Sequence, residues 1–200
     1  MILILSGKQG SGKSSIQAEI QKRAREKFEY VFLVNFADPL YVLHDFILNK
    51  MESAYGVAKP ASNKDGVLLQ LLGTEWGRKV HGPNIWVDIM KTRIANPTNQ
   101  RRLFIIADCR FENEFFGFPE ALRVRLYCDE AERKLRTHGW RETTNHASEI
   151  DLDKVHDAGL FDLYINTSGN NITIEGAASL ILAQLDKNSW VEKREKIYNG

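Results

Sequence analysis

The sequence has few of the residues that build disulfide frameworks and protein-held metal sites. It contains 2 cysteines, Cys109 and Cys128, and no C-x-x-C pair, a pattern that favours reduced, buried thiols. Its 5 histidines show no zinc-ligand spacing with cysteines or carboxylates. These scarcities argue against a disulfide-stapled fold and against a structural zinc site.

The sequence also lacks a strong charge bias and a long apolar run. The formal net charge is +1, so we expect no broad basic surface that binds a nucleic-acid polymer. No apolar run approaches the roughly 18 residues of a membrane span, and no basic leader precedes the first apolar run, so we expect a cytoplasmic protein with no membrane partner. With 43% hydrophobic and 26% charged residues in 200, the chain predicts one globular domain.

Residues 7–14, GKQGSGKS, fit the phosphate-loop pattern G-x-x-x-x-G-K-[ST] at every position. The apolar run Met1–Leu5 predicts a buried parallel strand before the loop, and residues 14–27 predict an amphipathic helix after it, with Ile16, Ile20 and Ala24 in one stripe. The strand–loop–helix order favours this interpretation over a chance glycine-rich turn. Such a loop turns its amide hydrogens toward an anion, while its lysine adds charge and its serine hydroxyl reaches Mg²⁺. We therefore expect ATP to be bound by Gly7, Gly10, Ser11, Gly12, Lys13, Ser14 and Ser15, with Mg²⁺ carried by the nucleotide.

The rest of the chain alternates between strand-like and helix-like segments. Further strands are predicted at 30–36, 103–107, 123–128 and 161–167, and a closing helix at 174–185. Between the second and third strands we expect three helices. The first is capped by Asp38, has Pro39 in its first turn, and buries Leu40, Leu43, Ile47 and Met51. The second, over 67–80, buries Leu68, Leu71 and Leu72 until GTEWGR interrupts it, and the third covers 83–94. This predicts a core of 1–36, 101–129 and 155–186, an insertion at 38–98, a lid near 130–150 and a tail at 187–200.

Polar residues at the ends of predicted strands are candidates for ligand contacts. Asp38 suits either a helix cap or a substrate contact. Asp108 follows a buried strand, where a carboxylate can hold the water shell of Mg²⁺ while Ser14 holds the ion. Arg110 could point at the same phosphates, or could pair with Glu112 or Glu114. Asn166, at the tip of the last strand, could approach an adenine.

Two further groups of residues have competing interpretations. Trp76 could stack on a base and Arg78 could bind a monophosphate. The alternative interpretation is that Trp76 packs in the core and Arg78 is solvated. Arg133, Arg136 and Arg141 suit a lid that neutralises a transferring phosphoryl group. Their acidic neighbours, Glu130, Glu132 and Glu142, offer a solvated, salt-bridged surface as the alternative.

Five segments together resemble the phage-type deoxynucleoside monophosphate kinases: GKQGSGKS, FADPL (36–40), LLQLLGTEWGR (68–78), ADCRFENE (107–114) and HASE (146–149). The resemblance implies a P-loop kinase fold of class α/β, a three-layer α/β/α arrangement with a five-stranded parallel sheet in order 2-3-1-4-5, a helical insertion that binds the nucleoside monophosphate and a short lid. It implies that the γ-phosphoryl group of ATP is transferred to a deoxynucleoside monophosphate, in host cytoplasm if the source is viral.

The resemblance also distributes the candidate residues between the two substrates. It places Lys13 and Ser14 on ATP and Mg²⁺, Asp38, Trp76 and Arg78 toward the acceptor, Asp108 and Arg110 between the two, and Arg133, Arg136 and Arg141 in the lid. Tyr41 departs from the family, which commonly has a basic residue near that position. The sequence leaves open a homodimer, a P-loop kinase of another acceptor, such as dephospho-coenzyme A or phosphomevalonate, and a non-catalytic ATP-binding switch.

Overall fold

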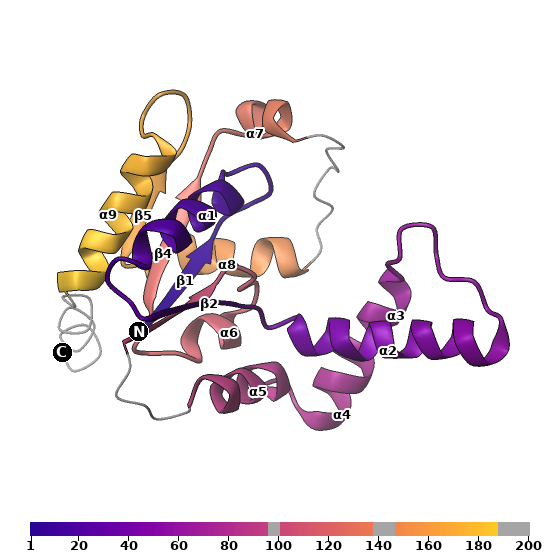
Figure 1. The fold of residues 1–200 in the computed structure, drawn as a ribbon. Helices are drawn as coiled ribbons and strands as arrows, with labels where there is room; N and C mark the ends of the chain where they lie inside the picture. Colours follow the sequence, from indigo (N-terminus) through magenta and orange to yellow (C-terminus); the bar gives the residue numbers. More distant parts are fainter. Residues whose placement is uncertain (96–100, 138–146, 188–200) are drawn as a thin grey trace. The chain divides into compact units, whose positions relative to one another are not determined.

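The structure is a computed structural model that describes residues 1–95, 101–137 and 147–187. It divides into two compact units, one made of Met1–Val34 and Thr98–Gly200 and the other of Asn35–Pro97. The first unit contains a parallel sheet whose strands lie in the order β2-β3-β1-β4-β5 (Figure 1). Its strands are β1 (Ile2–Ser6), β2 (Tyr30–Val34), β3 (Arg102–Ile106), β4 (Leu122–Tyr127) and β5 (Leu163–Asn166). This confirms the predicted α/β fold with strand order 2-3-1-4-5.

Helices cover both faces of this sheet. On one face α1 (Lys13–Ala24) packs against α9 (Ile174–Lys187), and the predicted stripe of Ile16, Ile20 and Ala24 is buried there. Figure 1 shows α6 (Glu112–Phe116) and α8 (Ala147–Asp157) on the other face, and α7 (Glu130–Arg136) follows β4. The first unit therefore has the three layers expected of this fold class.

Strand β4 carries two arginines and is nevertheless buried on both faces. Leu122, Val124 and Leu126 point into the core with α1 and α9, and Arg123 and Arg125 occupy the alternate positions at 2% and 6% exposure. The Arg123 guanidinium lies 4.5 Å from the centre of the Phe115 ring on α6. The polar-looking alternation of this strand therefore does not mark a solvent-exposed face.

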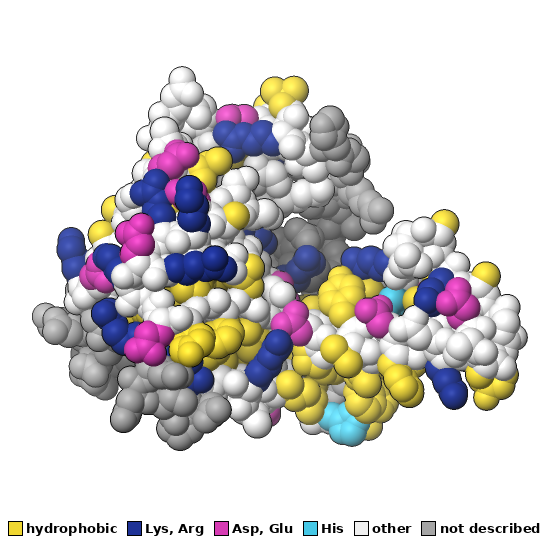
Figure 2. Space-filling model, viewed as in Figure 1, with side chains coloured by type: hydrophobic (Ala, Val, Ile, Leu, Met, Phe, Trp, Pro, Cys, Tyr) yellow, Lys and Arg dark blue, Asp and Glu magenta, His cyan; other side chains and the backbone are white. Residues whose placement is uncertain are grey.

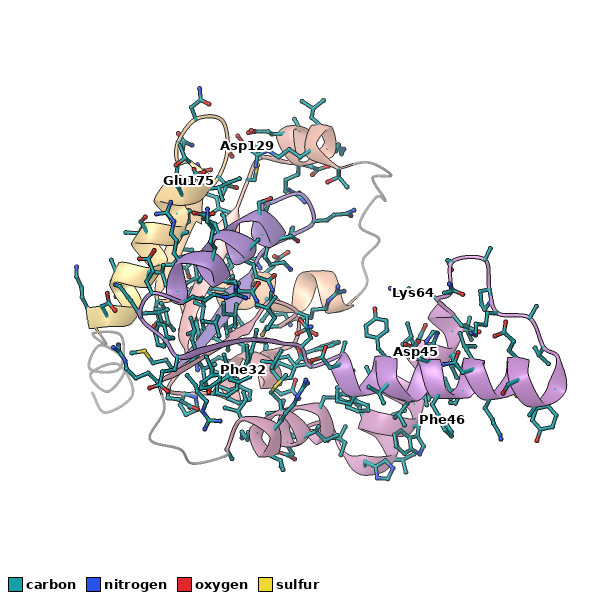
Figure 3. All side chains as sticks on the ribbon, viewed as in Figure 1. Phe32, Asp45, Phe46, Lys64, Asp129 and Glu175 are labelled. Carbon is teal, nitrogen blue, oxygen red and sulfur yellow. The ribbon has the colours of Figure 1, made fainter. Side chains whose placement is uncertain are left out.

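The second unit is helical, with α2 (Asp38–Tyr55), α3 (Gly66–Gln70), a π-helix η1 (Leu71–Arg78), α4 (Lys79–His81) and α5 (Ile85–Ile94). The burial predicted for α2 is partly wrong, because Met51 is exposed and the buried residue is His44. His44 Nε2 accepts a hydrogen bond of 2.9 Å from the Asp65 amide, which ties the loop before α3 to α2. Phe46, also on α2, is 68% exposed (Figure 3), and Figure 2 shows further hydrophobic side chains on the surface of this unit.

Two predictions about the helix boundaries in this unit are wrong. Asp38 does not cap α2, since Ala37 holds the cap position and the Asp38 carboxylate instead accepts hydrogen bonds from the amide and side chain of Asn35. GTEWGR does not interrupt the second helix, because the chain passes from α3 into η1 without a break. A π-helix is rare and often marks a functional site.

Within the described residues, no helix is both long and apolar enough to cross a bilayer.

Candidate functional site

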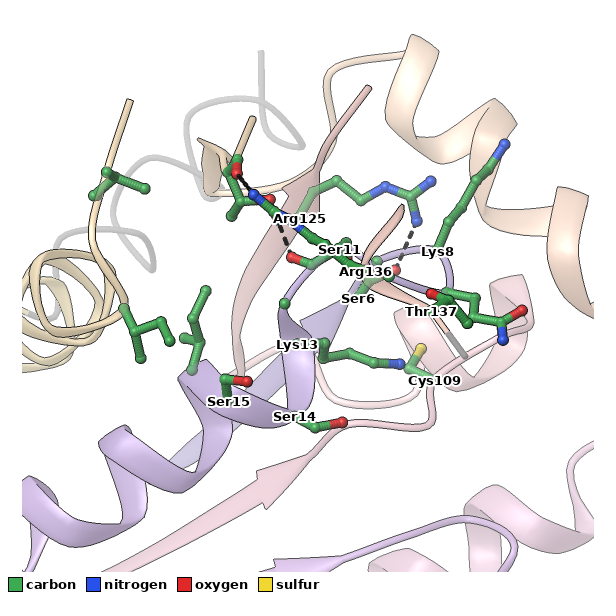
Figure 4. Close-up of a pocket in the computed structure, with 18 of the residues that line it drawn as sticks. Ser6, Lys8, Ser11, Lys13, Ser14, Ser15, Cys109, Arg125, Arg136 and Thr137 are labelled. Carbon is green, nitrogen blue, oxygen red and sulfur yellow. Dashed lines mark hydrogen bonds between the residues drawn. The ribbon is translucent and has the colours of Figure 1, made fainter. Parts of the chain in front are cut away.

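A cavity of about 820 Å³ surrounds the glycine-rich loop at the carboxyl end of β1 (Figure 4). Its lining includes all the residues expected to bind ATP phosphates, Gly7 and Gly10 through Ser15. Gly10 and Gly12 have φ of 79° and 80°, a left-handed conformation that favours glycine. Ser11 is 1% exposed, and its hydroxyl has no hydrogen-bond partner within the described part of the chain. A cradle of backbone amides with a buried hydroxyl fits phosphate oxygens.

Arg133 holds this loop from the side of α7. The arginine is buried and donates hydrogen bonds of 3.2 Å each to the carbonyl oxygens of Cys128 and Gln9. A Cβ on Gly10 would lie 2.6 Å from the Arg133 carbonyl oxygen, so this position accepts only glycine. The structure thus places Arg133 as a support of the loop backbone.

Positive side chains line the cavity, and no carboxylate does so among the described residues. Since two of the cations belong to the loop and the others come from three separate segments, their charges converge on the loop from several directions. The cationic lining consists of Lys8, Lys13, Arg110, Arg125 and Arg136. Such a concentration of positive charge suits a polyphosphate.

Lys13 points toward Cys109, the second residue after Ala107 (Figure 4). Burial raises the pKa of the Cys109 thiol well above its usual range, the charges of Glu114 and Asp108 raise it further, and Lys13 opposes them. Asp108 and Lys13 therefore both lie within electrostatic reach of the same thiol. Asp108 is half-buried, and its neighbours Cys109 and Arg110 line the cavity in its place.

The segment from Arg110 to Glu114 is held by a carboxylate. Glu114 is buried and its Oε2 accepts hydrogen bonds from the Arg110 amide at 2.8 Å and the Phe111 amide at 3.2 Å. Glu114 therefore binds the Arg110 backbone, and the predicted pairing of the Arg110 side chain with Glu112 or Glu114 stays a prediction. The Arg110 side chain is exposed and lines the cavity.

Arg136 and the end of β5 form another wall. The Arg136 guanidinium donates to Glu132 Oε1 at 2.5 Å and to the Thr167 carbonyl oxygen at 2.8 Å, so the salt-bridged alternative describes this residue. Asn166 does not line the cavity, because its Oδ1 accepts a hydrogen bond from the Ser168 amide; Thr167 lines it instead. Arg141 and the 145–149 segment lie outside the residues whose side chains are described.

Sequence reasoning missed Arg125, Lys8 and Asp153, which are joined at this cavity. Arg125 NH1 donates to Ser6 Oγ at 2.8 Å, and its NH2 donates to Asp153 Oδ1 at 2.9 Å. Asp153 Oδ2 accepts a hydrogen bond of 2.7 Å from Lys8 Nζ. The position of Arg125 two residues after Arg123 on a buried strand is the only sequence signal, and it does not identify Asp153 as the partner.

The helical unit has its own cavity of about 510 Å³. Asp38 and Trp76 line it, as does Arg93 from α5, and Arg93 NH1 donates to Asp38 Oδ2 at 2.7 Å. Burial alone would raise the pKa of Asp38, but hydrogen bonds from Asn35 and Arg93 outweigh it and lower that pKa. The remaining lining is mostly apolar or aromatic: Pro39, Val42, Leu43, His81, Ile85, Trp86 and Ile89.

The structure separates the three residues predicted to contact the acceptor. Asp38 and Trp76 line the same cavity, whereas Arg78 is not among its lining residues. Arg78 NH1 instead lies 3.4 Å from the Gly73 carbonyl oxygen, within η1. The basic group beside Asp38 is Arg93, which sequence reasoning did not single out as a site residue.

The donor set fits a metal ion that a nucleotide carries. Mg²⁺ prefers hard oxygen ligands and commonly uses one or two protein oxygens with substrate phosphates. Ser14 lines the phosphate cavity, and Asp108 supplies a carboxylate beside it. Over the described residues, no group of three or more His, Cys, Asp or Glu side chains could hold a metal by itself.

No family model matches the sequence, and no curated protein matches it. Solved structures are similar to this chain over most of its length. TT1252 from Thermus thermophilus has a TM-score of 0.54 and 14% identity over 92% of this chain and 97% of that chain. Shikimate kinase from Acinetobacter baumannii in complex with shikimate has a TM-score of 0.48 and 13% identity over 94% of this chain and 93% of that chain. Deoxyadenosine kinase from M. mycoides, with the products dCMP and dCDP bound, has a TM-score of 0.44 and 12% identity over 94% of this chain and 100% of that chain. At 14% identity, the similarity to TT1252 supports the fold alone.

Proposed function

We propose that this protein is an ATP-dependent deoxynucleoside monophosphate kinase, which transfers the γ-phosphoryl group of ATP to a deoxynucleoside monophosphate and releases ADP. The observation that carries the proposal is the phosphate loop in a cavity lined by five cations and, among its described lining residues, no carboxylate. A lining of this charge favours a nucleoside triphosphate over a neutral or cationic ligand.

The nucleotide would occupy this cavity with its phosphates on the loop. Lys13 would contact the outer phosphates, and the amides of residues 10–15 would hold the inner ones. Thr167 and the segment Ile172–Ile174 line the same cavity and would accommodate the base end of ATP. Asn166 would affect the base end of the cavity only by holding the turn at Ser168, whose amide donates a hydrogen bond to the Asn166 side chain.

The acceptor would bind in the cavity of the helical unit. Trp76 is 43% exposed and lines that cavity, so its ring offers a surface on which a base can stack. Asp38 and Arg93 supply a hydrogen-bond acceptor and a donor side by side. Arg78 would act by supporting η1, which carries Trp76.

The chemistry needs little covalent participation by the protein. The phosphate of the acceptor is already an anionic nucleophile at neutral pH, so alignment and charge neutralisation can supply most of the acceleration. Ser14 and Asp108 would hold Mg²⁺, which would neutralise part of the charge on the nucleotide phosphates. Lys13, Arg110 and Arg136 would act on the phosphoryl group, and Arg133 would keep the loop in place for it. A third lid arginine, Arg141, stays a prediction.

Two other functions use the same loop. A kinase of another small acceptor would share the cationic cavity, and a nucleotide-dependent switch would bind ATP without needing an acceptor cavity. The aromatic cavity beside Asp38 and Arg93 favours a nucleotide acceptor over both.

Release of ADP from Mg-ATP tests the proposal directly. Each deoxynucleoside and ribonucleoside monophosphate would be supplied in turn, together with dephospho-coenzyme A and phosphomevalonate. We expect stimulation by one or more deoxynucleotides. Turnover of either metabolite with none of any deoxynucleotide would overturn the choice of acceptor, and ATP binding without any acceptor-stimulated ADP release would support a switch.

A further inference from the structure

Asp153 on α8 binds two cations that reach the phosphate loop by different routes. Its Oδ2 accepts from Lys8 Nζ at 2.7 Å, and its Oδ1 accepts from Arg125 NH2 at 2.9 Å. Lys8 is the second residue of the loop, whereas Arg125 lies on the neighbouring strand β4. One carboxylate therefore joins α8, β4 and the loop.

Arg125 carries this connection to the last residue of β1. Ser6 and Arg125 are paired in the register of the two strands, and Arg125 NH1 donates to Ser6 Oγ at 2.8 Å (Figure 4). At 6% exposure the guanidinium is held almost out of water, and burial lowers its pKa while Asp153 opposes that shift. A buried cation without a counter-ion is strongly unfavourable, so Arg125 depends on Asp153 for its place.

The two routes end on either side of Gly7. Arg125 fixes Ser6 before this glycine, and Lys8 is fixed after it. Gly7 itself has little room, since a Cβ there would lie 2.5 Å from Ser11 Oγ and 2.8 Å from the Leu126 carbonyl oxygen. The path of the chain where β1 turns into the loop is thus set by side chains whose common partner is Asp153.

We propose that Asp153 is the positioning residue of the phosphate loop, acting through Lys8 and Arg125 on the turn that begins it. Its charge also fixes the direction of two of the cations that line the phosphate cavity. This inference rests on the proposed function only for the identity of the ligand that benefits, because the loop geometry is a property of the chain itself.

Hydrogen exchange of the loop without any nucleotide tests this role. Asp153→Asn keeps the shape of the side chain and removes its charge. We expect amides of residues 6–14 to exchange about tenfold faster, the size expected from the loss of about one charged hydrogen bond. Asp186→Asn is the matched control, because Asp186 also pairs with a lysine, Lys27, far along the chain from the loop.

Lys8→Met provides a second variant in case Asp153→Asn fails to fold, because it leaves the pair of Asp153 and Arg125 intact. Faster exchange of the loop in Lys8→Met, with the strands unchanged, supports the proposal. Unchanged loop exchange in Lys8→Met overturns it. The same holds if Asp153→Asn raises exchange uniformly over the whole sheet and Lys8→Met has no loop effect, since Asp153 would then only neutralise Arg125.

Affinity for ATP supplies a readout that separates this inference from the proposed function. We expect a dissociation constant about tenfold higher for Asp153→Asn than for Asp186→Asn, measured with a fluorescent ATP analogue. An unchanged dissociation constant would contradict the link from loop position to phosphate binding. A wild-type protein that binds no ATP would contradict the proposed function, whereas the exchange experiment would still decide on Asp153.

Discussion

The indole Nε1 of Trp86 donates a hydrogen bond of 3.0 Å to the carbonyl oxygen of Gly73. Trp86 lies on α5 at 2% exposure, and Gly73 lies in the π-helix η1. Arg78 Nη1 lies 3.4 Å from the same oxygen within η1, and the Trp86 hydrogen bond joins α5 to η1. Gly77, where a Cβ would overlap the Trp86 ring, therefore serves packing rather than helix termination.

Gly77→Ala tests this packing. A Cβ at Gly77 would overlap the ring of Trp86, whereas a Cβ at Gly73 would meet only the end of Leu40 at 3.3 Å. Both changes gain similar helix propensity, so their difference isolates the clash. We expect Gly77→Ala to lower the free energy of unfolding by about 1–3 kcal/mol and Gly73→Ala to change it by less than about 1 kcal/mol, measured by urea denaturation. Equal effects would contradict the account of η1.

Trp76→Ala tests the cavity of the helical unit. Because Trp76 lines this cavity and is 43% exposed, its loss removes a stacking surface with little loss of core packing. We expect the KM for the monophosphate acceptor to rise about tenfold, with the dissociation constant for ATP and the Tm nearly unchanged. Phe46→Ala on α2 is the control for losing an exposed aromatic ring. An unchanged acceptor KM in Trp76→Ala would place the acceptor elsewhere.

The lowered pKa of Asp38 predicts a specific pH dependence. The folded pKa lies below the ordinary value of 3.8, so the hydrogen bonds from Asn35 and Arg93 stabilise the folded unit fully above that value. This contribution is lost as the pH falls through the folded pKa. We expect Asp38→Asn to cost about 1 kcal/mol near neutral pH, a modest value because the carboxylate is partly exposed. The difference in Tm between wild type and variant should shrink below pH 3.8, and a difference that widens on acidification would refute this assignment.

The two cysteines should differ in reactivity. Burial, with the charges of Glu114 and Asp108, raises the pKa of Cys109, so little thiolate forms at neutral pH. Cys128 is half-buried. We expect iodoacetamide to modify Cys128 first, at least about tenfold faster, as followed by peptide mass spectrometry. Faster labelling of Cys109 would mean that the thiol beside Lys13 is not held neutral.

Most of the core of the fold could be predicted from the sequence. The phosphate loop requires a strand before it and a helix after it, and the apolar runs give the remaining strands to within one or two residues at most ends. The strand order came from the resemblance rather than from any local pattern. Lys13 and Ser14 both line the cavity, as the spacing fixed by the motif leads one to expect, and their assignment to ATP and Mg²⁺ stays a prediction.

The parts that sequence reasoning missed depend on partners far along the chain. Asp153 binds Arg125 over 28 residues and Lys8 over 145, and no local pattern encodes such pairs. Arg93 reaches Asp38 over 55 residues in the same way. Asn166 was an attractive candidate because it ends a strand, but amides at such positions also hold turns, as this one does.

The central claim, phosphoryl transfer from ATP to a deoxynucleoside monophosphate, is tested most directly by following a labelled γ-phosphoryl group. Wild type and Lys13→Ala would be given Mg-ATP and each deoxynucleotide, with Lys27→Ala as the control for a lysine outside the cavity. We expect label in a deoxynucleoside diphosphate with wild type and with Lys27→Ala, and turnover lower by roughly 10³-fold or more with Lys13→Ala. Label that stays in ATP or appears only in free phosphate, or transfer that is unchanged in Lys13→Ala, would contradict the account.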